Sequence, residues 1–181
     1  MRLARSAAVS EDVAIVTGWR RTARGGTIAP RPREVVVNIP SANADAWTIA
    51  EGVRDGLPSL LRFRPGLKKC LGDPRFSRRL QVTWTCLRSN TGMPSPEESD
   101  SMRPMEDQLV EAFEESEAGL LAFVFTHGGT RTWNFYVAES ADLAGLINHA
   151  LADLPRLPIE LSIEDDPEWS ELAQVFESVL E

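Results

Sequence analysis

Two strand-like stretches of the chain, residues 119–126 and 131–138, are separated by only four residues, His127-Gly128-Gly129-Thr130. Both stretches are rich in β-branched and aromatic residues, which favour strands, and the paired glycines can adopt the positive φ of a tight turn. This pattern predicts a β-hairpin. Its first strand is apolar at successive positions, as expected of a central strand that is covered on both faces of a sheet.

Strand and helix patterns alternate on either side of this hairpin. Residues 80–87 and 159–163 alternate between apolar and polar positions, which is typical of half-buried strands. Between them and the hairpin lie two stretches with apolar residues at helical spacing. The order β-α-β-β-α-β predicts an α+β fold of the ferredoxin-like class, with both helices on one face of a four-stranded antiparallel sheet.

Local signals predict where the first helix begins. Ser95 is followed by Pro96 and then by Glu98, which is the pattern of a capping box with proline in the first turn. Pro104 would interrupt a helix that began there, because an interior proline removes a hydrogen bond. We therefore predict a short first turn over 96–100 and a continuous helix that starts near Ser101.

Similar signals predict two later helices. Ser140 is the predicted cap of the second helix, which Pro155 would end. Asp166 is the predicted cap of a third amphipathic helix at the C-terminal end of the chain.

Two further regions precede the predicted βαββαβ unit. Strand-like runs at residues 47–51 and 57–63 flank Asp55-Gly56, a strong turn signal, and predict an extra N-terminal β-hairpin. Residues 1–34 are rich in Arg, Gly and Pro and show no apolar period, although residues 13–16 and 35–39 are short strand-like runs. We therefore divide the chain into a basic N-terminal extension at 1–40, poorly ordered or accessory, and a single α+β domain at 41–181. Residues 1–34 are predicted to be dispensable for folding.

Charge is distributed unevenly along the chain, whose formal net charge is −8. Residues 54–88 carry nine basic side chains against two acidic ones, whereas residues 89–181 carry three basic against twenty acidic. The acidic half is expected to attract a basic protein surface and to repel nucleic acid. No run approaches the roughly 20 apolar residues of a membrane helix, and no secretory signal is apparent, so we predict a cytoplasmic protein.

The two cysteines, Cys70 and Cys86, lack the spacing of a metal site or a redox motif. Idle thiols in a reducing compartment are the favoured interpretation, and a disulfide between them is the alternative.

Several motifs occur in an order that resembles a known family. They are the hairpin residues 126–136, Gly92-Met93-Pro94 before the first helix, residues 105–109 within it, and Asp166-Pro167-Glu168-Trp169 after the last strand. This set resembles the bacterial family catalogued as domain of unknown function 695, over about residues 46–172. The resemblance implies an α+β domain similar to the ferredoxin-like inhibitors of ribonuclease E, and it implies no established activity.

Candidates for binding or catalysis are few. Arg62, His127, Arg131 and Tyr136 could bind a phosphate or carboxylate through the central hairpin. The alternative is a turn histidine and a strand arginine that pairs with an acidic neighbour. Adjacent carboxylates on the helices point in different directions, so we predict no metal, no cofactor and no catalytic residues.

The leading hypothesis is a non-catalytic, cytoplasmic interaction module that regulates or sequesters a protein partner. The predicted partner surface is acidic and includes Glu111, Glu114 and Glu115. The alternative is an enzyme or small-anion-binding domain that uses residues 126–136. The two differ in one observable, namely whether Arg62, His127 and Arg131 line one pocket.

The large aromatic residues are interpreted as packing residues. Trp47, Trp84, Trp133 and Trp169 come from four different predicted elements, which favours a shared core over a ligand cage.

Overall fold

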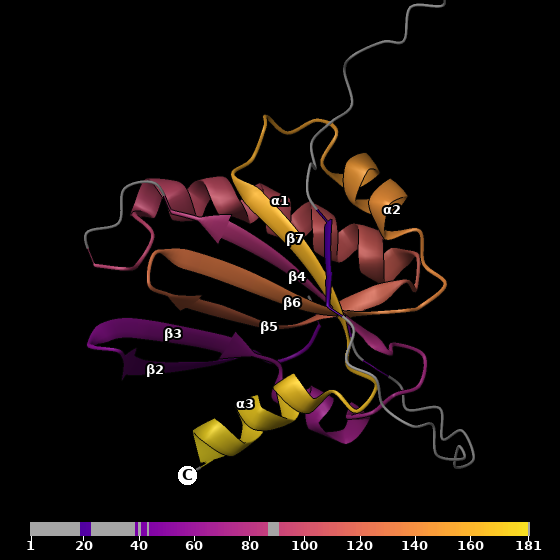
Figure 1. The fold of residues 1–181 in the computed structure, drawn as a ribbon, viewed down its shortest axis with the longest axis horizontal. Helices are drawn as coiled ribbons and strands as arrows, with labels where there is room; N and C mark the ends of the chain where they lie inside the picture. The colour runs from indigo at the N-terminus through magenta and orange to yellow at the C-terminus, as the bar shows by residue number, and fades with distance from the viewer. Residues whose placement is uncertain (1–18, 23–38, 40, 43, 87–90, 181) are drawn as a thin grey trace, which may run out of the picture.

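A computed structural model of the chain describes residues 19–22, 39, 41–42, 44–86 and 91–180. Its centre is a seven-stranded sheet with the order β1-β7-β4-β6-β5-β3-β2 (Figure 1). The strands are β1 (Trp19–Thr22), β2 (Thr48–Arg54), β3 (Leu57–Phe63), β4 (Arg78–Thr85), β5 (Gly119–His127), β6 (Thr130–Val137) and β7 (Ile159–Asp165). The helices are the 3-10 helix η1 (Pro65–Cys70), α1 (Pro96–Glu115), α2 (Leu143–Ala150) and α3 (Ser170–Leu180).

The predicted βαββαβ unit is confirmed as β4-α1-β5-β6-α2-β7. Its four strands lie in the order β7-β4-β6-β5, and every neighbouring pair among them is antiparallel. Figure 1 shows α1 and α2 on one side of the sheet and α3 with η1 on the other. The central hairpin is also confirmed, with Gly128 and Gly129 at φ values of 58° and 82° in its turn.

The extra hairpin is confirmed as β2 and β3. The two residues at its turn, Asp55 and Gly56, both have positive φ, as a two-residue hairpin turn requires. β3 pairs with β5, so this hairpin extends the sheet and leaves β2 at its edge.

One strand falls within the N-terminal extension and was not predicted. β1 pairs in parallel with β7, and residue Trp19 lies opposite Leu161. A strand of four residues is too short to show an apolar period, which explains why the sequence pattern did not indicate it. The predicted strand-like runs at 13–16 and 35–39 lie outside the described residues, except for Ile39, which belongs to no helix or strand.

The predicted start of α1 near Ser101 is wrong. The helix is continuous from Pro96, and Pro104 lies inside it. Ser95 and Glu98 form the predicted capping box, with both hydrogen bonds at 3.2 Å. Met102 and Met105 are almost completely buried on either side of Pro104, so core packing and the cap outweigh the hydrogen bond that the proline removes.

The predicted cap of α2 is also wrong. Asp142 caps the helix instead of Ser140, because its Oδ1 accepts a hydrogen bond of 3.1 Å from the N–H of Gly145. The helix ends at Ala150, and Leu151 closes it four residues before Pro155.

The role of Asp166 at the start of α3 is confirmed in a modified form. Its carboxylate accepts hydrogen bonds from the N–H groups of Ser170, at 2.7 Å, and Glu171, at 3.3 Å. Trp169 lies between this carboxylate and the helix in a left-handed conformation, with φ at 55°. Asp166 therefore caps α3 from four residues before its first residue.

The sheet separates two hydrophobic cores, so the prediction that the four tryptophans share one core is wrong. Trp84 and Trp133 lie in the core under α1 and α2, and Trp47 packs against that core. Trp169 lies in the other core, under α3 and η1. Trp133 is fully buried, as expected of a core residue. Side chains alternate between the two faces along each strand, so one sheet supplies both cores.

The two cysteines are free. Cys70 belongs to the core under α3, whereas Cys86 packs against the core under α1 and α2. The alternative of a disulfide between them is therefore excluded.

Candidate functional site

Arg62 and Arg131, two of the predicted ligand-binding residues, lie on the α1 face of the sheet. Arg62 forms an ion pair with Glu106 of α1, and its guanidinium lies 4.5 Å from the ring centroid of Trp47. The second carboxylate oxygen of Glu106 accepts a hydrogen bond of 2.7 Å from Nε1 of Trp133. Both oxygens of Glu106 are thus occupied by groups of the protein itself.

Arg131 is held differently. Its Nε donates to Oγ1 of Thr126 at 2.9 Å, and Nη1 lies 3.6 Å from the sulfur of Met102. Burial, together with the positive charge of Arg62, lowers the pKa of Arg131. Within the part of the chain that the structure describes, Arg131 forms no ion pair, contrary to the predicted pairing with an acidic neighbour.

His127 and Tyr136 lie on the opposite, α3 face. Nδ1 of His127 lies 3.4 Å from the carbonyl oxygen of Pro58, and its ring lies 6.0 Å from that of Phe125. Tyr136 is fully buried, and its ring stacks on Trp169 with 4.2 Å between centroids. The four predicted ligand-binding residues are therefore divided between two faces and do not line one pocket.

The three carboxylates of the predicted partner surface have different environments. Glu111 and Glu115 are exposed on α1. Glu114 is half-buried and accepts two hydrogen bonds, of 2.8 and 3.0 Å, from the backbone N–H of Ala42. It also pairs with the buried guanidinium of Arg64 at 3.2 Å, and its burial raises its pKa. Glu114 therefore has a structural role, because it joins α1 to Ala42 and to Arg64.

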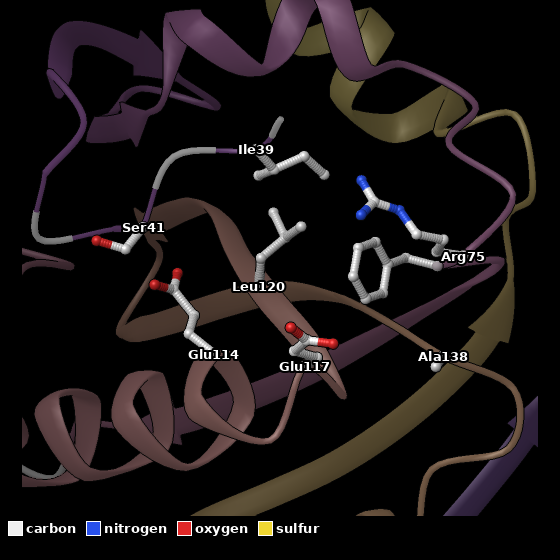
Figure 2. Close-up of a pocket in the computed structure, with 8 residues that line it drawn as sticks. Ile39, Ser41, Arg75, Glu114, Glu117, Leu120 and Ala138 are labelled. Carbon is white, nitrogen blue, oxygen red and sulfur yellow. The ribbon is translucent and has the colours of Figure 1, made fainter. Parts of the chain in front are cut away.

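A cavity of about 500 Å³ adjoins Glu114, with Leu120 and Ile39 among its apolar lining residues (Figure 2). Two further charged residues line it, Glu117 beside Glu114 and Arg75 across the cavity from Glu114. Arg75 already binds Asp73 through hydrogen bonds of 2.7 to 3.2 Å. Glu114 and Arg75 thus already bind other groups of the protein, so these two charged residues do not indicate a particular ligand for the cavity.

The exposed edge of the sheet is a feature that the sequence analysis did not identify. In β2 every residue except Ala50 is exposed, including Ile49 at 61% and Val53 at 77%. Ile49 pairs with Arg62, so Ile49, Glu51 and Val53 alternate onto the α1 face of the sheet. The sequence pattern predicted the strand β2, but the position of β2 at the edge of the sheet follows only from the order of all the strands.

A second feature that the sequence analysis did not identify is a cavity of about 390 Å³ between α3 and the sheet. Its lining includes polar residues of β4 and β6 and two phenylalanines of β5, Phe123 and Phe125. No sequence motif marks these residues, because they come together only through strand pairing.

In the described part of the chain, no three His, Cys, Asp or Glu side chains are grouped so that they could hold a metal ion. Among the described residues, no helix combines the length and the apolar character needed to cross a membrane.

The strand order, together with helices on both faces of the sheet, defines an α+β domain with a ferredoxin-like βαββαβ unit. A family model described as a family of unknown function, DUF695, matches residues 45–175, so the chain belongs to this family. No curated protein and no solved structure matches the chain.

Proposed function

We propose that this domain is a non-catalytic protein-interaction module in which β2 pairs with an extended segment of a partner protein. The observation that carries the proposal is the exposure of β2 at the sheet edge, where, among the residues that the structure describes, it pairs on one side only, with β3. The other side of an edge strand presents backbone N–H and C=O groups that can form hydrogen bonds with an added strand.

The composition of β2 supports this proposal. Proteins commonly protect an edge strand with proline, a bulge, several charges or a covering segment. β2 pairs with β3 in unbroken register, and it carries two exposed apolar side chains, Ile49 and Val53. Its charged residues are Glu51, between these two, and Arg54 at the end of the strand, which alternation places on the opposite face. An apolar edge of this kind is typical of strands that pair with another chain.

The same residues define the chemistry of the partner. Because cross-strand neighbours share a face, a strand added to β2 would place its own side chains beside Ile49, Glu51 and Val53. Apolar residues on both sides of a Lys or Arg would suit these three positions. A basic partner would also be attracted by the exposed carboxylates of α1, which raise the rate of association. We infer a regulatory or sequestering role that acts on such a partner in the cytoplasm.

The small-anion or enzyme alternative has less support. Its four residues are divided between the two faces of the sheet. The hydroxyl of Tyr136 forms internal hydrogen bonds, and Arg62 is already paired with Glu106.

The proposal is tested by capturing partners on the immobilised full chain and then measuring the affinity of the captured protein for the wild type and for two double variants. Ile49→Lys/Val53→Lys should weaken binding at least about tenfold, because it places charge on the apolar edge. The control, Ser140→Lys/Ala152→Lys, adds two lysines at exposed positions around α2 and should bind as the wild type does. Equal affinity of both double variants would refute pairing at β2.

A further inference from the structure

Arg62 and Arg131 form a pair of cationic side chains on the α1 face of the sheet that the proposed function does not use. They pair with residues of β5 that are two positions apart, so both side chains lie on one face. Arg62 contacts Glu106, and Arg131 contacts Met102. Glu106 and Met102 are four positions apart on α1, so the two guanidinium groups reach points about one helical turn, roughly 5.4 Å, apart.

The hydrogen bonds of this pair leave donors without acceptors. Nε of Arg131 donates to Thr126, and Nη1 lies near only the thioether of Met102. Among the described residues, Nη2 of Arg131 and Nη1 of Arg62 have no hydrogen-bond partner. Neither nitrogen is enclosed, since in the described part of the chain Nε of Arg62 is the one nitrogen of the two groups that is both buried and unpartnered. A ligand that arrives from solvent can therefore reach both Nη groups.

The charges around the two arginines do not balance. Glu106 already uses both carboxylate oxygens, and Glu98 belongs to the capping box at the start of α1. Cys86 is a free thiol whose pKa is raised by burial, so it is uncharged at neutral pH. Two guanidinium groups and one carboxylate give this cluster a net charge of +1. Burial lowers the pKa of Arg131, and the positive charge of Arg62 lowers it further, in agreement with this excess.

Leu60 provides an apolar surface beside the two arginines. It lies opposite Thr126, which also pairs with Arg131, and it precedes Arg62 by two residues in β3. Its side chain is therefore on the same face as both guanidinium groups, and it is partly exposed. An aliphatic chain attached to an anionic group can pack on it.

We propose that Arg62 and Arg131 bind the carboxylate of a small organic acid whose aliphatic chain packs on Leu60. One carboxylate oxygen accepts from Nη1 of Arg62 and the other from Nη2 of Arg131, in charge-assisted hydrogen bonds. A single negative charge balances the net charge of +1, whereas a phosphate dianion would leave excess negative charge beside Glu106. The site uses side chains of β3 and β6 and none of the backbone groups of β2, so it does not rest on the proposed strand pairing.

The test titrates the full chain with butyrate at constant ionic strength, with chloride as the replaced anion, and follows the indole N–H signals by NMR. The indole of Trp133 donates to Glu106 beside the proposed site, whereas that of Trp169 donates to the carbonyl oxygen of Phe76 in the other core. We expect the Trp133 signal to shift saturably with a Kd of about 1–10 mM, and the Trp169 signal to stay in place. Acetate should bind about three- to tenfold more weakly, because it lacks the two methylene groups that pack on Leu60. Phosphate should also bind more weakly than butyrate.

Three variants and a control locate the binding. Arg131→Gln should weaken butyrate binding about tenfold or more, and Arg131→Lys several-fold, because lysine keeps the charge but not the planar fork. Leu60→Ser should make butyrate and acetate bind equally. The matched control, Arg103→Gln, removes an exposed arginine of α1 that pairs with Asp100, and it should bind butyrate as the wild type does.

The proposal is overturned if the Trp133 shift does not saturate, if Trp133 and Trp169 respond alike, or if Arg131→Gln and Arg103→Gln bind butyrate equally. Phosphate that binds as tightly as butyrate would overturn the assignment to a carboxylate. None of these results bears on β2, whose role is tested by the capture experiment on a different pair of residues.

Discussion

The phenolic hydroxyl of Tyr136 donates a hydrogen bond of 2.8 Å to Oδ2 of Asp166, and it accepts one of 3.3 Å from the N–H of Leu172. The same carboxylate accepts from the backbone at the start of α3. Tyr136 therefore joins β6 to α3 through one buried network. Burial and the neighbouring carboxylate raise the pKa of Tyr136, so its hydroxyl keeps the proton that this bond requires.

Replacing Tyr136 with Phe should lower the free energy of unfolding by about 1–3 kcal/mol, because the Leu172 N–H loses its acceptor in a buried site. The ring would still stack on Trp169, so the loss reports the hydroxyl alone. Urea unfolding measures this change. As a control, Tyr136→Leu should cost more, since it also removes the stacked ring, and equal stability of Tyr136→Phe and wild type would contradict the role assigned to the hydroxyl.

Asp166 should make stability depend on acid pH. Burial alone would raise the pKa of Asp166, but the hydrogen bonds from Ser170, Tyr136 and Glu171 outweigh burial and lower it. A carboxyl with a lowered pKa in the folded state stabilises the fold above its unfolded pKa of about 3.9, and that contribution is lost as the pH falls through the folded pKa.

The measurement is the difference in unfolding free energy between wild type and Asp166→Asn from about pH 7 to about pH 2. The wild type should be more stable at neutral pH, and the difference should shrink in acid. A difference that stays constant over this range would show that the carboxylate charge contributes nothing. Subtracting the variant removes the contributions of other acids, such as Asp73, whose pKa is also lowered.

Arg64 should be one of the most sensitive charged positions. Its fully buried guanidinium binds Asp45 at 3.1 Å, Glu114 at 3.2 Å and the carbonyl oxygen of Leu121 at 2.9 Å. Arg64→Met would leave two partly buried carboxylates without this cation and should cost about 3–5 kcal/mol. The matched control is Arg103→Met, whose exposed pair with Asp100 should contribute at most about 1 kcal/mol. Similar losses in the two variants by chemical denaturation would refute this ranking.

Trp133→Ala should cost about 3–5 kcal/mol, as large-to-small changes in a core do. The indole is fully buried and also donates to Glu106, so its removal leaves that carboxylate oxygen without a partner. Trp133→Phe keeps much of the packing and should fall between the wild type and Trp133→Ala in thermal unfolding. A Trp133→Ala protein with wild-type stability would contradict the core role.

The sequence predicted those parts of the fold that depend on local signals. The Gly128-Gly129 and Asp55-Gly56 turns and the Ser95 capping box are each encoded within a few residues. The division of the aromatic residues between two cores depends instead on which face of the sheet α3 covers. Side-chain alternation shows that Trp133 and Tyr136, three positions apart in one strand, face opposite ways, but it does not show what covers each face.

The candidate sites could be predicted only in part for the same reason. Arg62 and Arg131 lie on one face near Glu106 because β3, β5 and β6 pair in a particular register. The exposed edge of β2 and the cavity between α3 and the sheet depend on the order of seven strands. No short motif contains this information, since the residues involved are separated by tens of positions along the chain.

The exposed acids of α1 should speed association with a basic partner, and the structure indicates which carboxylates to test. Glu114 is excluded because its replacement would disturb Arg64 and Ala42, whereas Asp107, Glu111 and Glu115 are exposed. The variant Asp107→Asn/Glu111→Gln/Glu115→Gln should slow association with the captured partner roughly tenfold at low salt and reduce the salt dependence of the rate. The control Glu160→Gln/Glu168→Gln/Glu177→Gln removes the same charge from exposed positions outside α1. If stopped-flow or surface-binding measurements give the same rates for both triple variants, net charge and not the surface of α1 attracts the partner.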